Sequence, residues 1–394
     1  MPRWTRKLLR RLRGPPAVLF HPEYRLPLPS FSARTGFDQR RAELALDALV
    51  ELGVLEVGDV IAPPTCGWDD IARVHDAAWL EGLTRPETLA SVFAVEPGEV
   101  PETVLASLRR VTGGTVLAAQ RAVDTGEPVV NLAGGFHHAR RGSGFAYCAV
   151  NDVAVAVAAL RASGWRGEVA VVDLDAHPPD GIADCMGGTA WIGSVSGDRW
   201  PAPAGVDEVS VPPGVADLDY LRAVETLLSR RPHADLVFVI AGGDVLAGDR
   251  HGGLGVSMDG VRARDALVFD GLRGVPSVWL PAGGYREDSW RVLAGTTLVV
   301  AGHRDLGIPA NLDPLRARFQ RVGRTLGLSE LGAGIQLTEA DLDETLGRRR
   351  PAVARLLGTY TTAGVELALE RYGILQPVRQ LGYRDLRVVV EPVE

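Results

Sequence analysis

A short apolar run at residues 169–172 leads directly into a cluster of acidic and imidazole side chains: Asp173, Asp175, His177 and Asp180. The run is mostly β-branched and predicts a buried strand of a parallel sheet. Side chains alternate along an extended chain, so Asp173, Asp175 and His177 would point to one side. Carboxylates gathered on one side repel each other unless a positive charge lies among them. A divalent metal bound by Asp175 and His177, with Asp173 supporting them, accounts for this pattern. An Asp-rich turn after a strand is the alternative.

This run belongs to a series of strand-like segments that alternate with helical patterns. The strand-like segments are residues 129–132, 169–174, 191–195, 236–240 and 277–280, and helical patterns lie at 152–162, 218–228 and 260–272. Such alternation predicts a parallel sheet with helices on both faces. We therefore expect a single-domain α/β fold for the main part of the chain.

The region before this series predicts a strand at residues 17–20 and further helices at 38–52, 71–83 and 103–122. The helix at 103–122 contains Gly113 and Gly114, which would let another backbone approach closely. Residues 84–101 are rich in proline and glutamate and predict a surface loop.

Reactive residues follow four of the strand-like segments directly. His137 and His138 come after the first, the Asp-His cluster after the second, Asp244 after the fourth and Tyr285 after the fifth. In open α/β sheets the functional site lies at the carboxyl ends of the strands. A histidine pair or a Gly-Gly turn carries little information alone. Their shared position predicts one site at one rim of the sheet.

The composition excludes several classes of function. The net charge of −7 gives the chain no electrostatic case for binding nucleic acid. Lys7 is the single lysine, which argues against Schiff-base and P-loop chemistry. The three cysteines are odd in number and widely spaced, so we expect neither a disulfide framework nor a cysteine metal cluster, and a reducing cytoplasm fits. No apolar run is long enough to span a membrane.

The two ends of the chain differ from its centre. Residues 1–16 form a basic segment that could be an amphipathic helix on an anionic surface or a solvated tail. Residues 17–312 carry the strand and helix series. Residues 313–394 lose that rhythm, and we expect them to form a helical extension packed on the core, with a strand at 386–390.

The motifs at the predicted rim resemble those of the zinc-dependent histone deacetylases of the arginase/deacetylase superfamily, most closely the class IV branch. The matching stretches are Gly134-Gly135-Phe136-His137-His138, Asp173-Leu174-Asp175-Ala176-His177, Gly243-Asp244 through Arg250, and Gly283-Gly284-Tyr285. The resemblance covers about residues 17–300 and implies that 17–312 is a deacetylase domain with the arginase/deacetylase fold.

The resemblance implies a set of metal ligands and a role for each neighbouring group. Asp175, His177 and Asp244 would bind zinc and leave a position open for water and a carbonyl oxygen. Iron(II) could occupy the same set. Related enzymes also imply a potassium site near Ser196.

The proton-transferring groups implied by the resemblance are histidines paired with carboxylates. His137 would pair with Asp173 and His138 with Asp180, which fixes the tautomer of each imidazole. His138 would be the general base and later the general acid. The hydroxyl of Tyr285 would stabilise the oxyanion.

Other positions imply a substrate tunnel, and some depart from the family pattern. Gly144, Phe145, Trp200 and Gly283 match its lining, where an aromatic slot would hold an extended alkyl chain. His251 stands where a tunnel leucine is usual, so it either makes the wall polar or turns to solvent.

One departure from the family pattern and one match to it lie closer to the metal. Pro178-Pro179 stiffens the turn that leads to Asp180, which puts the pair with His138 in doubt. Arg41 falls where the family keeps a basic residue beneath the metal.

These residues predict a metal-dependent amidohydrolase that removes an acyl group from an acylated lysine of a peptide or protein, or from a related acylated amine. An acylpolyamine deacetylase and a long-chain lysine deacylase are the alternatives within this class. A binding protein that has lost turnover and an arginase-like enzyme with two manganese ions are alternatives outside it. Assembly into an oligomer stays open.

Overall fold

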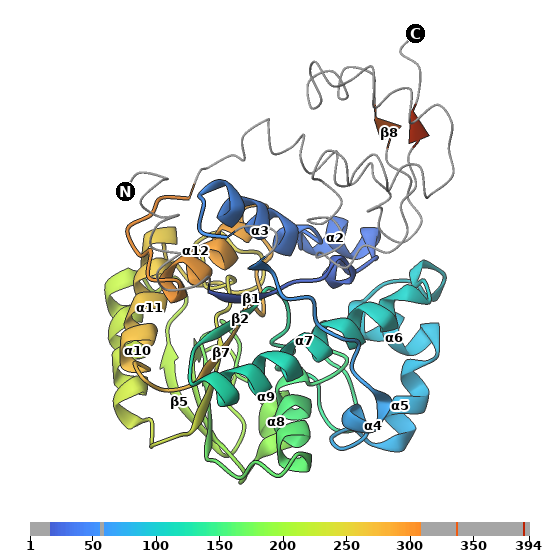
Figure 1. The fold of residues 1–394 in the computed structure, drawn as a ribbon, viewed down its shortest axis with the longest axis horizontal. Coiled ribbons are helices and arrows are strands. Elements are labelled where there is room, and N and C mark those ends of the chain that lie inside the picture. The colour runs from blue at the N-terminus through green and yellow to red at the C-terminus, as the bar shows by residue number, and fades with distance from the viewer. Residues whose placement is uncertain (1–15, 56–58, 309–335, 338–388, 391–394) are drawn as a thin grey trace.

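The computed structural model describes residues 16–55, 59–308, 336–337 and 389–390. Its centre is a seven-stranded, all-parallel sheet in the order β1-β2-β7-β6-β3-β4-β5 (Figure 1). The strands are β1 Ala17–Leu19, β2 Val129–Asn131, β3 Val169–Asp173, β4 Trp191–Gly197, β5 Val206–Val211, β6 Leu236–Ile240 and β7 Ser277–Leu280. The predicted parallel sheet is confirmed.

Helices connect the strands and cover the sheet. They are η1 Pro22–Tyr24, α2 Pro29–Thr35, α3 Arg41–Glu51, α4 Trp68–Ile71, α5 Ala77–Leu83, α6 Pro86–Phe93, η3 Pro97–Glu99, α7 Thr103–Thr125, α8 Asp152–Ala162, α9 Asp180–Met186, α10 Asp217–Arg230, α11 Met258–Gly271 and α12 Trp290–Val300. Among the described helices, none combines the length and the apolar sequence needed to span a bilayer.

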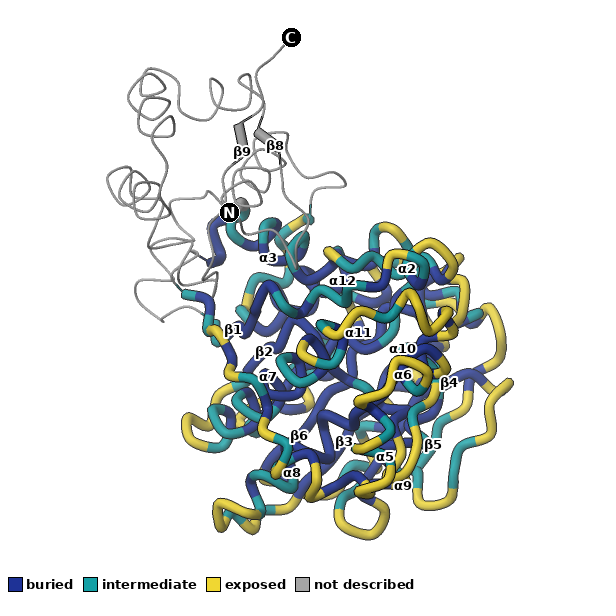
Figure 2. The backbone as a smooth tube through the Cα atoms, turned by 90° about the vertical axis from the view of Figure 1, so that its right-hand side faces the viewer, coloured by how far each residue is buried: buried dark blue, intermediate teal, exposed yellow. Residues whose placement is uncertain are grey.

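The sheet separates two hydrophobic layers. Along β3, Ala170 and Val172 belong to the cluster that contains side chains of α3, α10, α11 and α12, whereas Val169 and Val171 belong to the one that contains side chains of α6, α7, α8 and α9. All five residues of β3 are buried, as are those of its neighbour β6, and both strands lie in the buried interior in Figure 2. Burial on both faces explains why this strand is apolar at every position up to Asp173 rather than at alternate positions.

Two of the sequence-based expectations about elements are wrong, and one strand was missed. The edge strand β5 was not expected because three of the six residues in Val-Asp-Glu-Val-Ser-Val are polar, which leaves no apolar run like those of the buried strands. The helix expected at 71–83 is two helices, α4 and α5. The loop expected at 84–101 contains α6, in which Pro86 occupies the first turn and Leu89, Val92 and Phe93 are buried.

The ends of the chain lie mostly outside the described residues. The basic segment 1–16 is described only at its last residue, and little of 313–394 is described. The expected strand at 386–390 is present as β9, Val389–Val390, which pairs with β8, Gln336–Leu337, in a separate two-stranded sheet.

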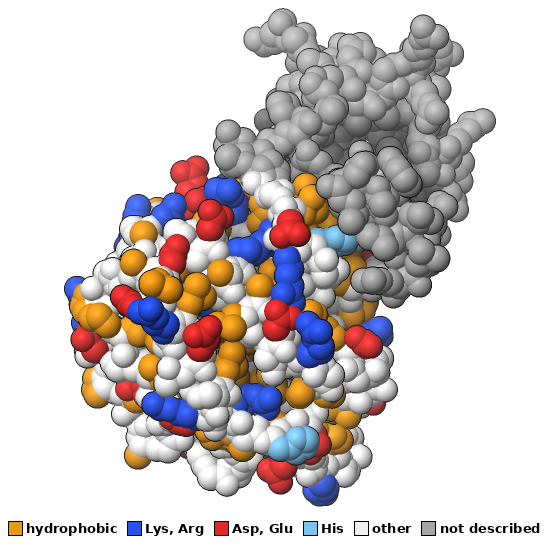
Figure 3. Space-filling model, turned by 90° about the vertical axis from the view of Figure 1, so that its left-hand side faces the viewer, with side chains coloured by type: hydrophobic (Ala, Val, Ile, Leu, Met, Phe, Trp, Pro, Cys, Tyr) orange, Lys and Arg blue, Asp and Glu red, His pale blue; other side chains and the backbone are white. Residues whose placement is uncertain are grey.

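On the described face in Figure 3, acidic and basic side chains are interspersed, a mixture that gives this face no preference for a polyanion.

Glycine in α7 allows close packing, as expected. A Cβ on Gly113 would overlap the carbonyl oxygen of Pro64, and one on Gly114 would overlap the hydroxyl of Tyr24. The segment before α4 and the helix η1 therefore lie against the backbone of α7.

We predict that Gly113→Ala lowers the free energy of unfolding by about 1–3 kcal/mol, because overpacking outweighs the higher helix propensity of alanine. Gly82→Ala in α5 is the matched control, since its Cβ would meet only Thr88 at 3.5 Å. Urea denaturation measures both. Stabilisation of the two variants to the same extent would contradict the packing argument.

Candidate metal centre and active site

The strand order brings four distant loops together. Strands β2, β7, β6 and β3 are neighbours in the sheet, and the loops that follow them carry His137 and His138, Tyr285, Asp244, and Asp175 with His177. Because all strands are parallel, the four loops leave the same edge. A cavity of about 720 Å³ lies there and is lined by all six of these residues.

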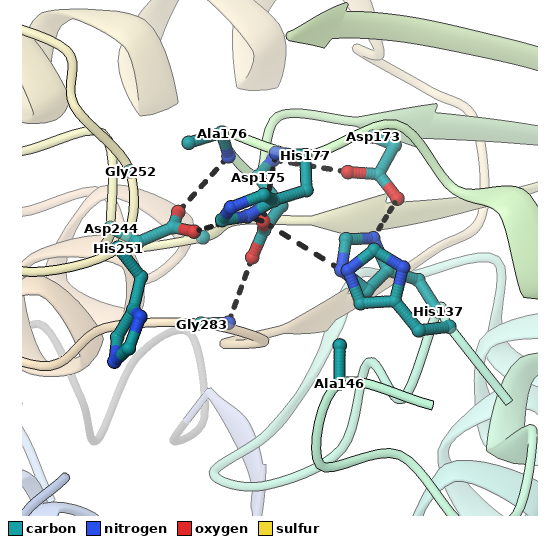
Figure 4. Close-up of polar contacts among 12 residues, drawn as sticks. His137, Ala146, Asp173, Asp175, Ala176, His177, Asp244, His251, Gly252 and Gly283 are labelled. Atoms are coloured by element: carbon teal, nitrogen blue, oxygen red, sulfur yellow. Dashed lines mark hydrogen bonds and ion pairs between the residues drawn. The ribbon is translucent and has the colours of Figure 1, made fainter. Parts of the chain in front are cut away.

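Asp175, His177 and Asp244 converge on one point. The Nδ1 atom of His177 lies 3.0 Å from Oδ1 of Asp175 and 3.1 Å from Oδ2 of Asp244 (Figure 4). One ligand atom from each residue lies within 4.8 Å of the others, and this is the one such group among the described residues. The geometry matches a tight, three-ligand divalent site with one nitrogen and two carboxylates.

Backbone amides aim the two carboxylates. The other oxygen of Asp175 accepts a hydrogen bond from the amide of Gly283 at 2.9 Å, and the other oxygen of Asp244 accepts one from Ala176 at 3.0 Å. A Cβ on Gly283 would lie 2.6 Å from Asp175, so glycine is needed for this approach. Gly283 therefore contacts the metal ligands, and its backbone lines the cavity.

The charges of this group favour a cation at the point that the three side chains share. Burial and the charge of Asp175 raise the pKa of Asp244 to about 7. Burial opposes protonation of His177, but hydrogen bonds to Asp175 and Asp244 outweigh it and raise the pKa of His177 to about 11. The imidazolium proton thus occupies the point where a metal would sit. A divalent cation bound to the same three atoms would replace that proton and balance both carboxylates.

The two neighbouring histidines are each held by a carboxylate. Nδ1 of His137 lies 2.9 Å from Asp173, and Nδ1 of His138 lies 2.5 Å from Asp180. Arg140 donates to the second oxygen of Asp180 at 2.7 Å. The turn at Pro178-Pro179 therefore leaves the second pair intact, because Pro179 precedes α9 and Asp180 begins it.

Burial and charge separate the two imidazoles. Burial disfavours charge on both, but Asp173 and Asp175 outweigh it and raise the pKa of His137 to about 9. Burial and the charge of His137 lower the pKa of His138 to about 4. Their rings lie 4.0 Å apart. At neutral pH His138 is therefore the imidazole able to accept a proton.

The residues expected in the tunnel fall into two groups. Phe145 and Trp200 are 55% and 49% exposed at the cavity wall. The Phe145 ring lies 5.8 Å from that of His138, and the Trp200 ring 5.7 Å from that of His177. Gly144 also lines the cavity and in addition allows close packing, since a Cβ there would meet Val92, Cys148 and Trp79 within 3.0 Å.

Tyr285 lines the cavity and packs against aromatic rings. Its ring lies 4.4 Å from that of His251, which is exposed but stacks edge-on against it, and 6.2 Å from Phe37. The amide of Tyr285 donates to Asp249 at 2.7 Å, and the other oxygen of Asp249 accepts from the amide of His251 at 2.9 Å. Asp249 thus fixes the loops on which both rings stand, a role that its position in the sequence did not reveal.

Two buried charges beside the site support its backbone. Asp152, the first residue of α8, accepts from the amides of Gly135 at 3.0 Å and Phe136 at 2.8 Å and so orients the loop that carries His137. Arg41 lies at the cavity wall and donates to the carbonyl of Ala282 at 2.6 Å; its expected place beneath the metal stays a prediction. Burial lowers the pKa of Arg41 to about 10, which leaves it charged at neutral pH.

Arg264 bridges the backbones of the two loops that carry the candidate metal ligands. Its role could not be predicted from the sequence. It is fully buried in α11, where its Nη1 donates to the carbonyls of Gly242 at 2.7 Å and Leu174 at 3.3 Å. Leu174 precedes Asp175, and Gly242 lies two residues before Asp244. Asp265 pairs with the guanidinium at 2.9 Å and is itself bonded to Thr296 in α12.

We predict that Arg264→Lys weakens divalent-metal binding by about 10–100-fold, the range found when groups that orient ligands are removed. The lysine keeps the charge beside Asp265 but cannot span both carbonyls. Competition with a chromophoric chelator measures the dissociation constant.

Arg262→Lys, on the same helix, is the matched control. Arg262 also donates to two carbonyls, those of Gly295 and Leu306, but neither belongs to a metal-carrying loop. Equal losses of metal affinity in the two variants would mean that Arg264 supports the fold alone.

Comparisons with known proteins agree with this geometry. The family model described as "Histone deacetylase domain" matches residues 35–300. "Histone deacetylase 2" of Arabidopsis thaliana is 32% identical over 71% of this chain and 76% of its own length. An uncharacterized protein of Picosynechococcus is 30% identical over 73% of this chain and 98% of its own.

A solved structure shows the same fold. The acetylpolyamine aminohydrolase from Burkholderia pseudomallei superposes with a TM-score of 0.59 at 23% identity, over 73% of this chain and 98% of its own. The expected arginase/deacetylase fold is confirmed. The narrower expectation of a class IV branch stays a prediction.

Proposed function

The chain belongs to the histone deacetylase family, whose members hydrolyse amides, and from this premise we propose that it removes an acyl group from an acylated lysine or a related acylated amine. The observation that carries the proposal is the position of the Asp175–His177–Asp244 group. It lies in the wall of the same cavity as Tyr285 and the His137–His138 pair. We take residues 17–312 as the deacetylase domain.

Asp175, His177 and Asp244 would hold the metal, which we propose to be zinc because the family is generally zinc-dependent. Iron(II) accepts the same donor atoms. The chemistry that such a cation supplies is polarisation of the acyl carbonyl and a lower pKa for a water molecule.

The side chains around this group move protons and hold charge. Since Nδ1 of His138 is bonded to Asp180, the proton of the attacking water passes to Nε2. The same nitrogen then returns a proton to the leaving amine. His137, held by Asp173, supplies positive charge beside them. The Tyr285 hydroxyl donates to the acyl oxygen as negative charge develops there.

The cavity mouth favours an extended chain that ends in an amine. Phe145 and Trp200 stand on its wall beside His138 and His177, so an alkyl chain between them would carry its amide to the metal group. A lysine side chain and a polyamine both meet this requirement. The structural neighbour is described as an acetylpolyamine aminohydrolase, which keeps the small-amine alternative in place.

Two alternatives fit the site less well. An arginase-like site with two manganese ions would need Asp173 and Asp180 as ligands, but they are bonded to His137 and His138. A binding protein without turnover would have no use for a neutral His138 beside the metal group.

Several expectations stay predictions. One of them is a potassium ion bound near Ser196. In the structure the Ser196 hydroxyl donates a hydrogen bond to the carboxylate of Glu208 at 2.5 Å. A cytoplasmic location and an oligomeric state are others.

We predict one zinc ion per chain and release of the free acid when the zinc-loaded protein is given acylated lysine peptides or acylpolyamines. Mass spectrometry of the products and metal analysis measure both. A protein that binds zinc but releases no acid from any of these substrates would contradict the proposal.

We predict that Tyr285→Phe lowers kcat by about 10²–10³-fold, as for the loss of other oxyanion donors, and leaves zinc content and the far-UV circular dichroism spectrum unchanged. Only the hydroxyl is lost in this variant, so the ring contacts with His251 and Phe37 remain. Near-normal turnover would remove Tyr285 from the mechanism.

A further inference from the structure

A tight turn at the cavity wall holds two residues in a conformation that glycine normally adopts. Phe145 and Cys148 exchange both backbone hydrogen bonds, at 3.0 and 2.9 Å, across a two-residue turn. The turn residues Ala146 and Tyr147 have φ values of 42° and 70°. Positive φ at both positions is the requirement of a type I′ turn, for which Asn-Gly is the usual sequence. Positive φ is unfavourable for a tyrosine, because its Cβ atom then comes too close to backbone atoms.

Contacts with two helices hold the turn in place. The amide of Tyr147 donates to the carbonyl of Val92 in α6 at 3.3 Å. Its ring packs edge-on at 4.8 Å against Phe31 of α2, which is 2% exposed and packs in turn against Phe93 at 5.6 Å. The strained backbone therefore presents a large ring at a fixed position, and a constraint kept in this way points to function.

The other side of the Tyr147 ring faces the site. It lies 5.9 Å from the ring of Tyr285 and 6.0 Å from that of His251, which also contact each other. The three rings form one continuous wall of the cavity that contains the metal group. Figure 4 shows the His251 ring of this wall in the same view as Asp175, His177 and Asp244.

We propose that Tyr147 is a specificity-determining residue whose ring restricts the size of the acyl group. The inference rests on the proposed function, because the acyl carbonyl must then lie between the Tyr285 hydroxyl and the metal group. The alkyl part of the acyl group would then extend from the carbonyl alongside the Tyr285 ring. The Tyr147 ring lies between Tyr285 and Phe31 and would limit the length of that alkyl part. On this side of the cavity the ring leaves room for a short acyl group, so we expect amines with short acyl groups to be the favoured substrate class.

The test is Tyr147→Gly, the substitution that the turn itself favours. Acetyl-, butyryl- and octanoyl-lysine peptides of one sequence are compared with wild type. We expect the octanoyl-to-acetyl ratio of kcat/KM to rise by about tenfold or more, since even one methylene changes discrimination in an apolar pocket by 10–200-fold. Glycine also removes the unfavourable φ, which offsets part of the packing lost with the ring, and far-UV circular dichroism checks that the variant is folded.

Two further variants separate the ring from the backbone. Tyr147→Phe keeps the ring, and Ala146→Gly relaxes the same turn without opening the wall; in both, the octanoyl-to-acetyl ratio stays within twofold of wild type. A Tyr147→Gly ratio equal to wild type, or a similar rise in Ala146→Gly, overturns the proposal. If wild type hydrolyses none of these peptides or their polyamine counterparts, the proposed function fails first and this inference with it.

Discussion

Two buried carboxylates that point at the same imidazole nitrogen impose a charge requirement on the whole site. Asp175 and Asp244 are at most 1% exposed, and each places one oxygen near Nδ1 of His177. Burial of two such groups is unfavourable without a compensating positive charge. A proton on His177 satisfies the requirement when no metal is bound, and a divalent cation satisfies it more completely. The neighbouring architecture keeps these atoms at this spacing.

The sheet and its surroundings maintain that spacing from several directions. Parallel strands in the order β2-β7-β6-β3 deliver the four loops to one edge. The amides of Gly283 and Ala176 turn one oxygen of each carboxylate away from the centre. Arg264 in α11 donates hydrogen bonds to the backbone carbonyls at the start of both loops. Because the polar groups beneath the site are bonded to fixed backbone atoms, the ligands are preorganised before any metal arrives.

The sequence allowed prediction of the parts of the site that lie next to strands. Apolar runs that end in Asp-x-Asp-x-His, Gly-Gly-Asp or Gly-Gly-Tyr define both the strand and the polar group that follows it, so the sheet and the residues around the metal could be predicted. The partly buried edge strand β5 could not, because polar residues interrupt its sequence and it lacks the apolar run of a fully buried strand.

Supporting residues were harder to predict because their role depends on tertiary position. Arg264 is one of many arginines in the chain, and only packing shows that it is fully buried behind the metal loops. The turn at Ala146-Tyr147 lacks the Asn-Gly signature that would reveal positive φ. Asp249 resembles any turn aspartate until its bonds to the amides of Tyr285 and His251 are seen. Such residues act through a backbone conformation that the sequence does not specify locally.

The most direct measurement is the position of the metal itself. Anomalous diffraction collected on both sides of the zinc absorption edge, from crystals of the zinc-loaded protein, locates the ion without reference to activity. The charge argument predicts one strong peak at this edge of the sheet, within about 2.0–2.2 Å of Nδ1 of His177 and of one oxygen each of Asp175 and Asp244. A zinc peak elsewhere, or two metal ions that share Asp173 or Asp180, would contradict it.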